Sequence, residues 1–542
     1  MCGIVGWVDF QRPRGSDRES LELMTAAMDA RGPDAGGHWL DAHAGLGHRR
    51  LAIIDVKRGN QPMLAGSEAD PHAVLSYSGE VYNFKELRHE LYHRGHYFHT
   101  HSDTEVVLAA YQEWGTGLVD RLNGMFAFAL WDAREQRLLL VRDRLGIKPL
   151  YYSELAGGVL FGSEPKALLA HPDFSKVVDY EGLADLLALA KTPGKTPLRN
   201  LYEVPPGCFL AVGRTGSRLH RYWRLESEPH ADGIPETVGH VRDLLEDIVQ
   251  RQLITDVPLC TLLSGGLDSS ALTAIAANEL AANGKGQVSS FSVDFAGSAR
   301  DFQSTEFRPE RDNPYAVLAA EHIGTDHRTI ELASESLLSD KAPRAVLDAH
   351  DLPLTFGDVD SSLYLLFSRI REHSTVALSG ESADEVFGGY GWFHDPTVVA
   401  GAEFPWLSRM QLIPPSLLTC QFRRQTRFDE YVSDAYRSAV SEVARIDTED
   451  AGEQRMRELS HLHLTRWLQI LLDRKDRLSM ASGLEVRVPF CDHRLVQYVY
   501  NIPWKMKCFD GKEKSVLRGA VSDLLPESVL NRKKVLTRPL EI

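Results

Sequence analysis

The sequence predicts an α/β protein with at least two domains. Its 542 residues exceed what one hydrophobic core usually organises. In the second half, an apolar run at 257–263 precedes a glycine-rich turn and a strong helix former at 271–277, the pattern of a buried strand that leads into a helix. A polar stretch at 226–235, rich in Pro, Gly, Asp and His, is the best candidate for a linker.

The turn of this unit, residues 264–270, has the sequence SGGLDSS. A strand, a tight turn and a helix start direct several free backbone N–H groups to one point, where the helix dipole favours phosphate. Asp268 would repel phosphate unless a divalent cation lay between them, as Mg²⁺ does on nucleotides. An ordinary strand-to-helix turn with a serine cap is the simpler alternative, although the full heptad is more specific than a Gly-Gly pair.

The composition is that of a soluble globular protein, with 43% hydrophobic and 25% charged residues. Acidic residues outnumber basic ones by 75 to 60, and the net charge of −15 argues against a general nucleic-acid surface. No stretch approaches the roughly 20 apolar residues of a membrane span, and no signal peptide is visible. The six cysteines lack metal-ligand or disulfide spacing, so we expect a reduced, cytoplasmic protein.

The first residues form a strand pattern with Cys2 in second position. A small second residue permits removal of the initiator methionine, which would make Cys2 the N-terminus. Its α-amino group, with an ordinary pKa of about 7.7–8.0, could then act as the base for its own thiol. The alternative is a small apolar residue that merely begins a strand.

Three later segments of the first half carry polar residues at element ends. Arg50 lies in a predicted strand at 47–55. A predicted strand and turn at 76–83 contains the tripeptide Ser78-Gly79-Glu80, and Asp103 follows an N-cap serine that opens a helix. Further strands are predicted at 124–131 and 137–141.

Together these segments resemble the class II glutamine amidotransferase domain over residues 2 to about 215. The resemblance implies a four-layer αββα sandwich of the N-terminal-nucleophile (Ntn) type, which hydrolyses glutamine to glutamate and ammonia. It assigns five residues to the glutamine site: Cys2 as the nucleophile, Arg50 to the α-carboxylate, Asp103 to the α-ammonium, Gly79 to the oxyanion, and Glu80 to glutamine binding. The alternative for Arg50 and Asp103 is a surface ion pair of little value.

Ser78 departs from that resemblance, because many members of the family carry asparagine before the Gly-Glu pair. A serine hydroxyl is a shorter donor than an asparagine amide. Loss of one oxyanion donor costs roughly 10²–10³ in rate elsewhere. We hypothesise that the Ser78 hydroxyl still serves as the second donor.

The second half contains further strand–loop–helix patterns. Val293 lies in a buried strand at 289–295, whose carboxyl end is expected to border a nucleotide. The segment 375–390 clusters three carboxylates after a strand, and such a cluster near phosphates needs a cation. Helix-dipole compensation explains the acidic pair at 384–385 but not the Ser-Gly-Glu turn before it. Two more motif blocks follow at 472–492 and 511–518.

These blocks resemble, in order, the synthetase domain of glutamine-dependent asparagine synthetases over about 239–534. The resemblance implies a doubly wound parallel sheet of the ATP pyrophosphatase type. The predicted domains are an amidotransferase at 2–215, a linker at 216–235 and a synthetase domain at 236–542. The family reaction joins them: the aspartate side chain attacks Mg·ATP to give β-aspartyl-AMP and PPi, and ammonia arrives through an internal passage.

The same resemblance distributes roles over the synthetase domain, with ATP and Mg²⁺ as implied ligands. Asp268 and Asp384 are expected to hold Mg²⁺, and Lys514 to neutralise the transferring phosphate. Glu381 is the candidate base for ammonia and, with Arg487, contacts the acid substrate, although Arg487 in an ion pair with Glu485 or Asp492 is nearly as good an interpretation. The expected ATP-binding residues are Leu263, Ser264, Gly265, Gly266, Asp268, Ser269, Ser270, Val293, Ser379 and Gly380.

Three alternatives stay open at this point. The scaffold could amidate another carboxylate, such as a peptidoglycan or natural-product acid, chosen by residues 354–358 and those near Arg487. It could close a ring with an internal amine, as β-lactam synthetases do, but Cys2 with Arg50 and Asp103 argues against that. It could also be a non-catalytic homologue. The expected partners are glutamine, aspartate or another acid, and ATP, and the resemblance allows a homodimer.

Overall fold

The computed structural model describes residues 2–13, 15, 17–304, 310–352, 356–408 and 417–532. These residues fold into two compact units. The first comprises Met1–Arg224, Leu418–Val432 and Gln469–Gly483, and the second Leu225–Leu417, Ser433–Leu468 and Leu484–Ile542, each in its described part. Two segments from the second half of the sequence therefore pack with the first unit. The predicted boundaries at 2–215, 216–235 and 236–542 stay a prediction.

The first unit contains two antiparallel sheets, each of six strands within the described ranges. One has the order β10-β8-β9-β1-β3-β2: β1 (Gly3–Asp9), β2 (Ala35–Leu40), β3 (Ala44–Arg50), β8 (Tyr151–Leu155), β9 (Gly158–Gly162), β10 (Tyr202–Glu203). The other has the order β12-β11-β7-β6-β5-β4: β4 (Met63–Gly66), β5 (Pro71–Val81), β6 (Gly124–Asp132), β7 (Arg137–Arg142), β11 (Cys208–Gly213), β12 (Gly216–Arg221).

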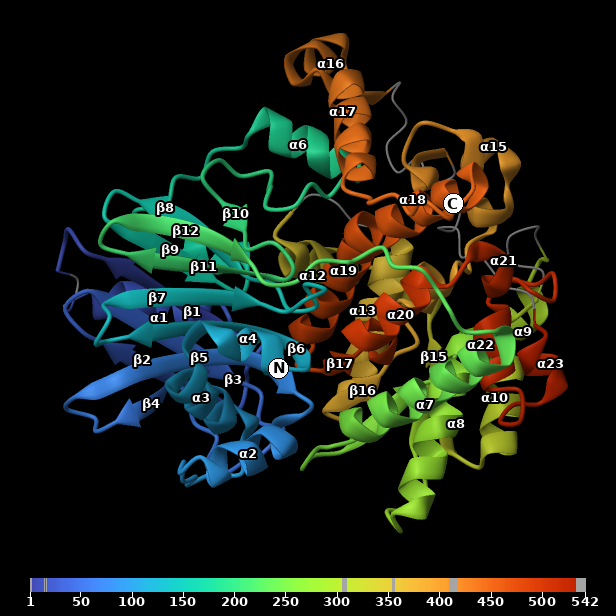
Figure 1. Cartoon of the computed structure of the whole chain (residues 1–542), viewed down its shortest axis with the longest axis horizontal. Coiled ribbons are helices and arrows are strands. Elements are labelled where there is room, and N and C mark those ends of the chain that lie inside the picture. Colours follow the sequence, from blue (N-terminus) through green and yellow to red (C-terminus); the bar gives the residue numbers. More distant parts are fainter. Residues whose placement is uncertain are drawn as a thin grey trace. The chain divides into compact units, whose positions relative to one another are not determined.

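The two sheets face each other across a core of alternating apolar side chains, and helices cover their outer faces (Figure 1). Val8, Leu46, Trp131 and Phe161 are among the buried residues between the sheets. The helices of this unit are α1 (Arg18–Ala26), α2 (Phe84–His93), α3 (Asp103–Trp114), α4 (Leu118–Arg121), α5 (Pro165–Leu169), α6 (Tyr180–Leu187) and α16 (Cys420–Thr426). Because α1 and α5 pack on one sheet and α3 on the other, the predicted αββα sandwich is confirmed.

The second unit is built on a parallel sheet with five strands in its described part, in the order β15-β14-β13-β16-β17. Its strands are β13 (Leu259–Leu262), β14 (Ser289–Phe295), β15 (Asp326–Leu332), β16 (Val376–Leu378) and β17 (Glu485–Arg487). The chain runs outward from β13 to β15 and then returns to add β16 on the other side of β13. Open parallel sheets bind ligands at the carboxyl ends of the strands where the order reverses, which here is between β13 and β16.

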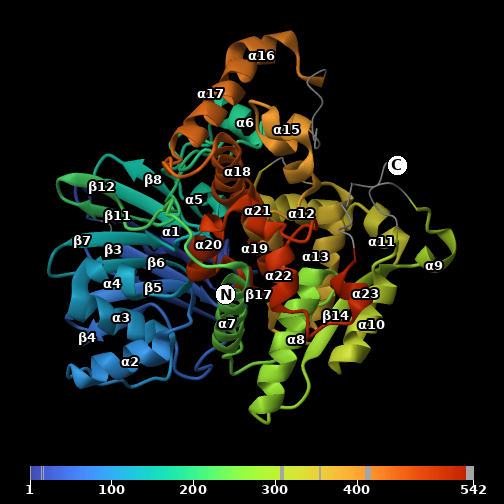
Figure 2. The same ribbon diagram turned by 45° about the vertical axis from the view of Figure 1, so that its right-hand side comes forward.

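Two groups of helices lie beside this sheet, and each group includes one helix that packs on a neighbouring helix instead of on the strands (Figure 2). The first is α7 (Ile234–Gln252), α8 (Leu267–Ala282) and α10 (Asn313–Ile323), and the second α12 (Lys341–His350) and α13 (Asp358–Arg371). The other helices of the unit are α9 (Ser298–Asp301), α11 (Ser334–Leu338), α14 (Ala383–Phe387), α15 (Pro396–Ala400), α18 (Ala451–Leu462), α20 (His493–Asn501), α21 (Trp504–Lys507), α22 (Ser515–Ala520) and α23 (Glu527–Leu530). Two further helices, α17 (Phe428–Ser441) and α19 (Leu468–Ala481), have residues in both units.

Two elements begin or end differently from the sequence expectation. In the predicted strand and turn at 76–83, β5 continues through Gly79 and pairs with β6 as far as Val81, so the turn begins only after Val81. Helix α8 begins at Leu267, inside the SGGLDSS heptad, with Gly266 as an extended N-cap. Asp268 is therefore in the first turn of the helix, where a carboxylate complements the dipole.

In the ranges that the structure describes, no helix is long and apolar enough to cross a bilayer.

The inter-sheet core yields a stability prediction. Phe161 is fully buried, so Phe161→Ala removes its packing and leaves a cavity that costs about 3–5 kcal/mol. We expect a lower midpoint of thermal unfolding by circular dichroism. Leu219→Ala is the matched control on the exposed strand β12 and should change stability by less than about 0.5 kcal/mol. Equal midpoints for the two variants would contradict the assignment of this core.

Candidate active site

Cys2 lies directly before β1, a strand held on both sides by β3 and β9. Its side chain is buried and its Sγ lies 3.9 Å from the Leu51 carbonyl oxygen. Burial raises the pKa of the thiol, so at neutral pH it carries its proton and needs a base. His48 does not supply that base, because burial lowers its pKa to about 3. Residue 1, whose removal the sequence analysis predicts, lies outside the described residues.

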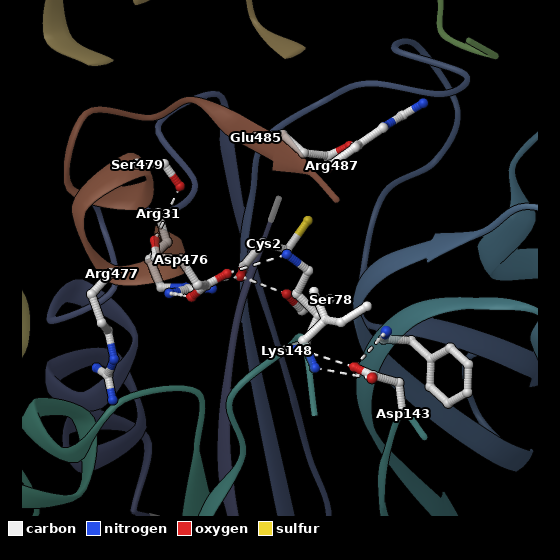
Figure 3. A network of polar contacts seen from close by, with 12 residues as sticks. Cys2, Arg31, Ser78, Asp143, Lys148, Asp476, Arg477, Ser479, Glu485 and Arg487 are labelled. Atoms are coloured by element: carbon white, nitrogen blue, oxygen red, sulfur yellow. Dashed lines mark hydrogen bonds and ion pairs between the residues drawn. The ribbon is translucent and has the colours of Figure 1, made fainter. Parts of the chain in front are cut away.

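The main-chain carbonyl of Cys2 accepts two hydrogen bonds (Figure 3). One comes from Ser78 Oγ at 2.8 Å and the other from Arg31 Nε at 3.2 Å. A hydroxyl has a single proton to donate. Ser78 would therefore have to release the Cys2 carbonyl before it could act as an oxyanion donor.

Gly79 follows Ser78 in β5 and needs to be glycine. Its φ is +146°, and a Cβ there would lie 2.1 Å from the Met125 carbonyl oxygen. Any other residue would strain the backbone at this position and push β5 away from β6. Glycine at this position thus permits the backbone conformation next to Ser78 and the close pairing of β5 with β6.

Arg50 and Asp103 are buried and anchored separately. The Arg50 guanidinium donates to the main-chain carbonyls of Ile54, Asp55 and Val56, at 3.3, 2.8 and 2.8 Å. Asp103 Oδ2 accepts from Tyr77 Oη at 2.8 Å and from the Val81 N–H at 3.0 Å. A surface ion pair is thereby excluded for both residues.

The charges of Arg50 and Glu80 both act on the Cys2 thiol. Arg50 lowers its pKa and Glu80 raises it, in each case by less than burial does. Cys2, Ser78, Arg50 and Glu80 therefore belong to one site. Asp103 contacts Val81, next to Glu80, and so extends the site along the end of β5.

In the second unit, the SGGLDSS heptad forms a closed loop at the carboxyl end of β13. Ser269 Oγ accepts from the Ser264 N–H at 3.1 Å and lies 3.0 Å from Ser264 Oγ. Gly265 has a φ of +73°, and a Cβ there would lie 2.4 Å from the Ala316 nitrogen. The loop is thus held in shape by its own serines and by close approach to α10. Leu263 and Ser270 are buried beneath it.

Lys514 joins the two predicted metal-binding carboxylates. Its Nζ lies 2.7 Å from both carboxylate oxygens of Asp268 and 2.6 Å from Asp384 Oδ1. Burial opposes the charge on Lys514, but the two carboxylates outweigh it and raise the pKa of the ammonium. Two carboxylates that converge on one cation form a donor set that also suits Mg²⁺, provided that phosphate oxygens complete its shell.

The loop after β16 lies against the heptad, as the strand order requires. A Cβ on Gly380 would lie 2.9 Å from the Ser269 nitrogen. The Glu381 N–H donates to Ser379 Oγ at 3.3 Å, so Glu381 begins the turn that leads to Asp384. Val293 lies near the carboxyl end of β14, the neighbour of β13. The structure therefore brings the predicted nucleotide-binding loops of this unit to one edge of the sheet.

Arg487 is anchored inside the second unit. Its Nε donates to Glu485 Oε1 at 2.7 Å, and its Nη1 donates to the carbonyls of Gln252 and Ile254 at 2.6 and 2.8 Å. Its side chain is 1% exposed. This geometry favours the structural ion pair with Glu485 over a contact with the acid substrate. Of the predicted acceptor-choosing loop, residues 354 and 355 lie outside the described residues.

Comparison with known proteins identifies the family. The chain matches the asparagine synthase family over residues 240–540 and the glutamine amidotransferase domain family over residues 1–223. Glutamine-hydrolysing asparagine synthetase 3 of Bacillus subtilis (strain 168) is 44% identical over 537 residues, which cover 98% of this chain and 86% of that protein.

This chain belongs to the glutamine-hydrolysing asparagine synthetases. Asparagine synthetase 1 of the same bacterium is 32% identical over 99% of this chain and 86% of its own length. Asparagine synthetase B of Escherichia coli (strain K12) is 30% identical over 98% of this chain and 81% of its own length.

Two residues near Cys2 were not predicted from the sequence as site residues. Arg31 lies in an Arg-Gly-Pro-Asp segment to which the sequence assigns no function, and Asp476 lies in the motif block at 472–492. Arg31 Nη1 lies 2.7 Å from Asp476 Oδ2 and Nε of the same side chain binds the Cys2 carbonyl. The charged pattern around Asp476 could have marked it as functional, but nothing local indicates its partner.

The size of the kcat loss in Ser78→Ala distinguishes two roles of Ser78, a hydrogen bond to the Cys2 carbonyl and an oxyanion donor. Loss of one neutral hydrogen bond to the Cys2 carbonyl is worth about 1 kcal/mol, so Ser78→Ala should lower the glutaminase kcat about fivefold. A loss of about 10²–10³ would instead indicate an oxyanion donor. Glutamate release at saturating glutamine measures the difference.

The matched control is Ser76→Ala. Ser76 is a buried serine of the same strand whose Oγ donates to the Gly47 carbonyl at 3.1 Å. Its replacement should leave kcat unchanged. A Ser76→Ala variant as slow as Ser78→Ala would assign the loss to damage of β5.

Proposed function

We propose that this chain transfers the amide nitrogen of glutamine to the side-chain carboxylate of aspartate, with cleavage of ATP to AMP and PPi. The observation that carries the proposal is the 44% identity to a glutamine-hydrolysing asparagine synthetase over nearly the whole chain. A buried second-position cysteine and a Lys514–Asp268–Asp384 cluster support it with the chemistry that each half-reaction needs.

The first half-reaction releases ammonia at Cys2. Once residue 1 is removed, the α-amino group accepts the thiol proton, and sulfur forms a bond to the glutamine carboxamide carbon. The C–N bond breaks, ammonia leaves with a proton from the amine, and water hydrolyses the thioester to glutamate. The Gly79 N–H is the proposed oxyanion donor, in a strand held by its pairing with β6.

Glutamine is held by charged groups already in place. We assign the α-carboxylate to Arg50 and the α-ammonium to Asp103, with Glu80 close to both. Arg50 is oriented by three loop carbonyls, and Asp103 by Tyr77 and Val81. Such preorganised side chains lose little freedom when the substrate binds.

The second half-reaction uses the edge of the parallel sheet. A carboxylate oxygen of aspartate attacks the α-phosphorus of ATP, and the bond to the bridging oxygen of PPi breaks. The heptad with Ser379, Gly380 and Val293 would bind the nucleotide, and Lys514 would offset the charge on the transferring phosphate. Ammonia then attacks the acyl adenylate, with Glu381 as the proposed proton acceptor, and AMP leaves.

Mg²⁺ fits this site as a second cation. Asp268 and Asp384 would hold it together with phosphate oxygens, and it would supply charge that reduces repulsion between the phosphates and these carboxylates. In the described residues no group of three or more His, Cys, Asp or Glu side chains could hold a metal ion, and phosphate oxygens and water would supply the other ligands. A homodimer and a cytoplasmic location stay predictions.

Because the glutaminase site and the nucleotide site are separate, a variant of one site should lose one activity and keep the other. Cys2→Ala should abolish asparagine formation from glutamine and keep formation from ammonium at close to the wild-type rate. Asp268→Asn is the reciprocal variant: it frees Lys514 from one carboxylate and should abolish both syntheses while glutamate release continues. Asparagine formed from each nitrogen source, and glutamate, are measured by amino-acid analysis. Loss of ammonium-dependent synthesis in a folded Cys2→Ala enzyme would refute this division of labour.

The acceptor acid is tested with the wild-type chain. With glutamine and Mg·ATP, aspartate should elicit release of PPi together with AMP and asparagine in equal amounts, whereas ADP should not form. Glutamate, of the same charge and one methylene longer, is the matched acceptor control. PPi release that depends on an acid other than aspartate would support another acceptor, and no acid-dependent PPi at all would overturn the synthetase proposal.

A further inference from the structure

Helix α19 brings a segment of the second half of the sequence into the first unit. Residues Gln469–Gly483 belong to the first unit, although Leu468 and Leu484 on either side belong to the second. Gln469 Nε2 donates to the Leu145 carbonyl, which fixes the start of the segment there. The helix then presents Asp473 and Asp476, one turn apart, to two different sets of cations.

Asp476 is paired at both of its oxygens. Oδ2 lies 2.7 Å from Arg31 Nη1, and Oδ1 lies 3.2 Å from Lys148 Nζ. All three side chains are at most 3% exposed. Burial opposes the charge of Asp476, but Arg31 and Lys148 outweigh it and lower its pKa to about 2. The carboxylate is thus ionised at neutral pH and engaged on both sides.

Arg31 connects the fixed carboxylate of Asp476 to the main chain of Cys2 (Figure 3). Its Nη1 binds Asp476 and also Glu164 Oε1 at 2.7 Å, while its Nε binds the Cys2 carbonyl. The guanidinium group is a rigid plane, so its carboxylate partners determine where the Nε–H points. That bond and the one from Ser78 fix the peptide plane that follows Cys2.

We propose that Asp476 is a positioning residue for Cys2, acting through Arg31, an assignment that rests on the proposed glutaminase function. It sets the orientation of the Cys2 main chain, and with it the directions of the α-amino group and of Sγ. A thiol and an amine on one residue react well only when both face the substrate carbonyl, and a misplacement of about 1 Å can cost about 10²-fold in rate.

The proposed effect of Asp476 on Cys2 is geometric and not electrostatic. The Arg31 charge is matched by two carboxylates in direct contact. The charged side chains that act most strongly on the thiol are Arg50 and Glu80. Replacement of Asp476 should therefore change kcat without moving the pH dependence of Cys2 reactivity. Replacement of a residue that only stabilised the fold would change neither kcat nor this pH dependence.

Asp476→Asn is the decisive variant because an amide has one acceptor oxygen where Asp476 uses two. Either Arg31 or Lys148 then faces an NH₂ donor in a buried place. Asp473→Asn is the matched control: Asp473 Oδ2 binds Lys191 Nζ at 2.8 Å, so this change breaks an ion pair of the same helix outside the contacts of Arg31. Asp476→Glu keeps both acceptors and should recover part of the activity.

The measurement uses the full-length enzyme and glutamate release as a function of glutamine. We expect Asp476→Asn to lower kcat at least about tenfold with KM within about twofold, and Asp473→Asn to stay within about twofold of wild type. Alkylation of Cys2 by iodoacetamide across pH should keep its midpoint. Ammonium-dependent synthesis should be unchanged in both variants and verifies their folding.

Three results would overturn the proposal: an unchanged kcat in Asp476→Asn, an equal loss in Asp473→Asn, or a shifted alkylation midpoint. A double variant adds a further test, because a lysine lacks the guanidinium group through which Arg31 contacts both Asp476 and the Cys2 carbonyl. In an Arg31→Lys background Asp476→Asn should cost less than about twofold, whereas fully additive losses would contradict transmission through Arg31. Absence of glutaminase in the wild type would instead refute the proposed function.

Discussion

The pairing of β1 on both sides is the constraint on which the first site depends. Gly3 pairs with Arg49 of β3, and from Val5 onward the strand also pairs with β9. Because β1 pairs with β3 from its first residue, the main chain that directly follows Cys2 is held in place. Cys2 is therefore held inside the protein although it stands at the beginning of the chain. Ser78 and Arg31 complete this restraint at its carbonyl, and the charges of Arg50 and Glu80 act on a thiol whose place is already given.

The second site obeys the same logic with parallel strands. Thr261, Leu378 and Arg487 lie in register across β13, β16 and β17, so the loops after the first two strands meet at one edge. Lys514, which is 246 residues away from Asp268 in sequence, inserts its ammonium between the carboxylates that those loops supply. The buried ammonium of Lys514 is paired with both carboxylates, and removal of one of them would leave its charge poorly compensated.

Local motifs predicted residues of both half-reactions, because the side chains and backbone groups of each motif lie on a short stretch of chain. Cys2, the SGGLDSS heptad and the Ser379–Glu381 turn could be identified in this way, and the strand order explains why the last two meet. Pairings between distant segments could not be predicted: Arg31 and Asp476 are 445 residues apart, and nothing in the local sequence of either residue indicates its partner. Arg487 shows a second limit, since its role depends on carbonyls of α7 and the turn after it. Gly79 shows a third limit of the sequence, because only its pairing with β6 reveals how far β5 extends past this residue.

The late position of α19 in the sequence has a consequence for synthesis of the protein on the ribosome. A nascent chain that has not yet been translated as far as residue 469 already contains Cys2, Ser78 and Arg31, but not the carboxylate of Asp476. On our assignment, its nucleophile is still incompletely oriented. Such a chain would hydrolyse glutamine more slowly than the finished enzyme, which also contains the half that consumes the ammonia.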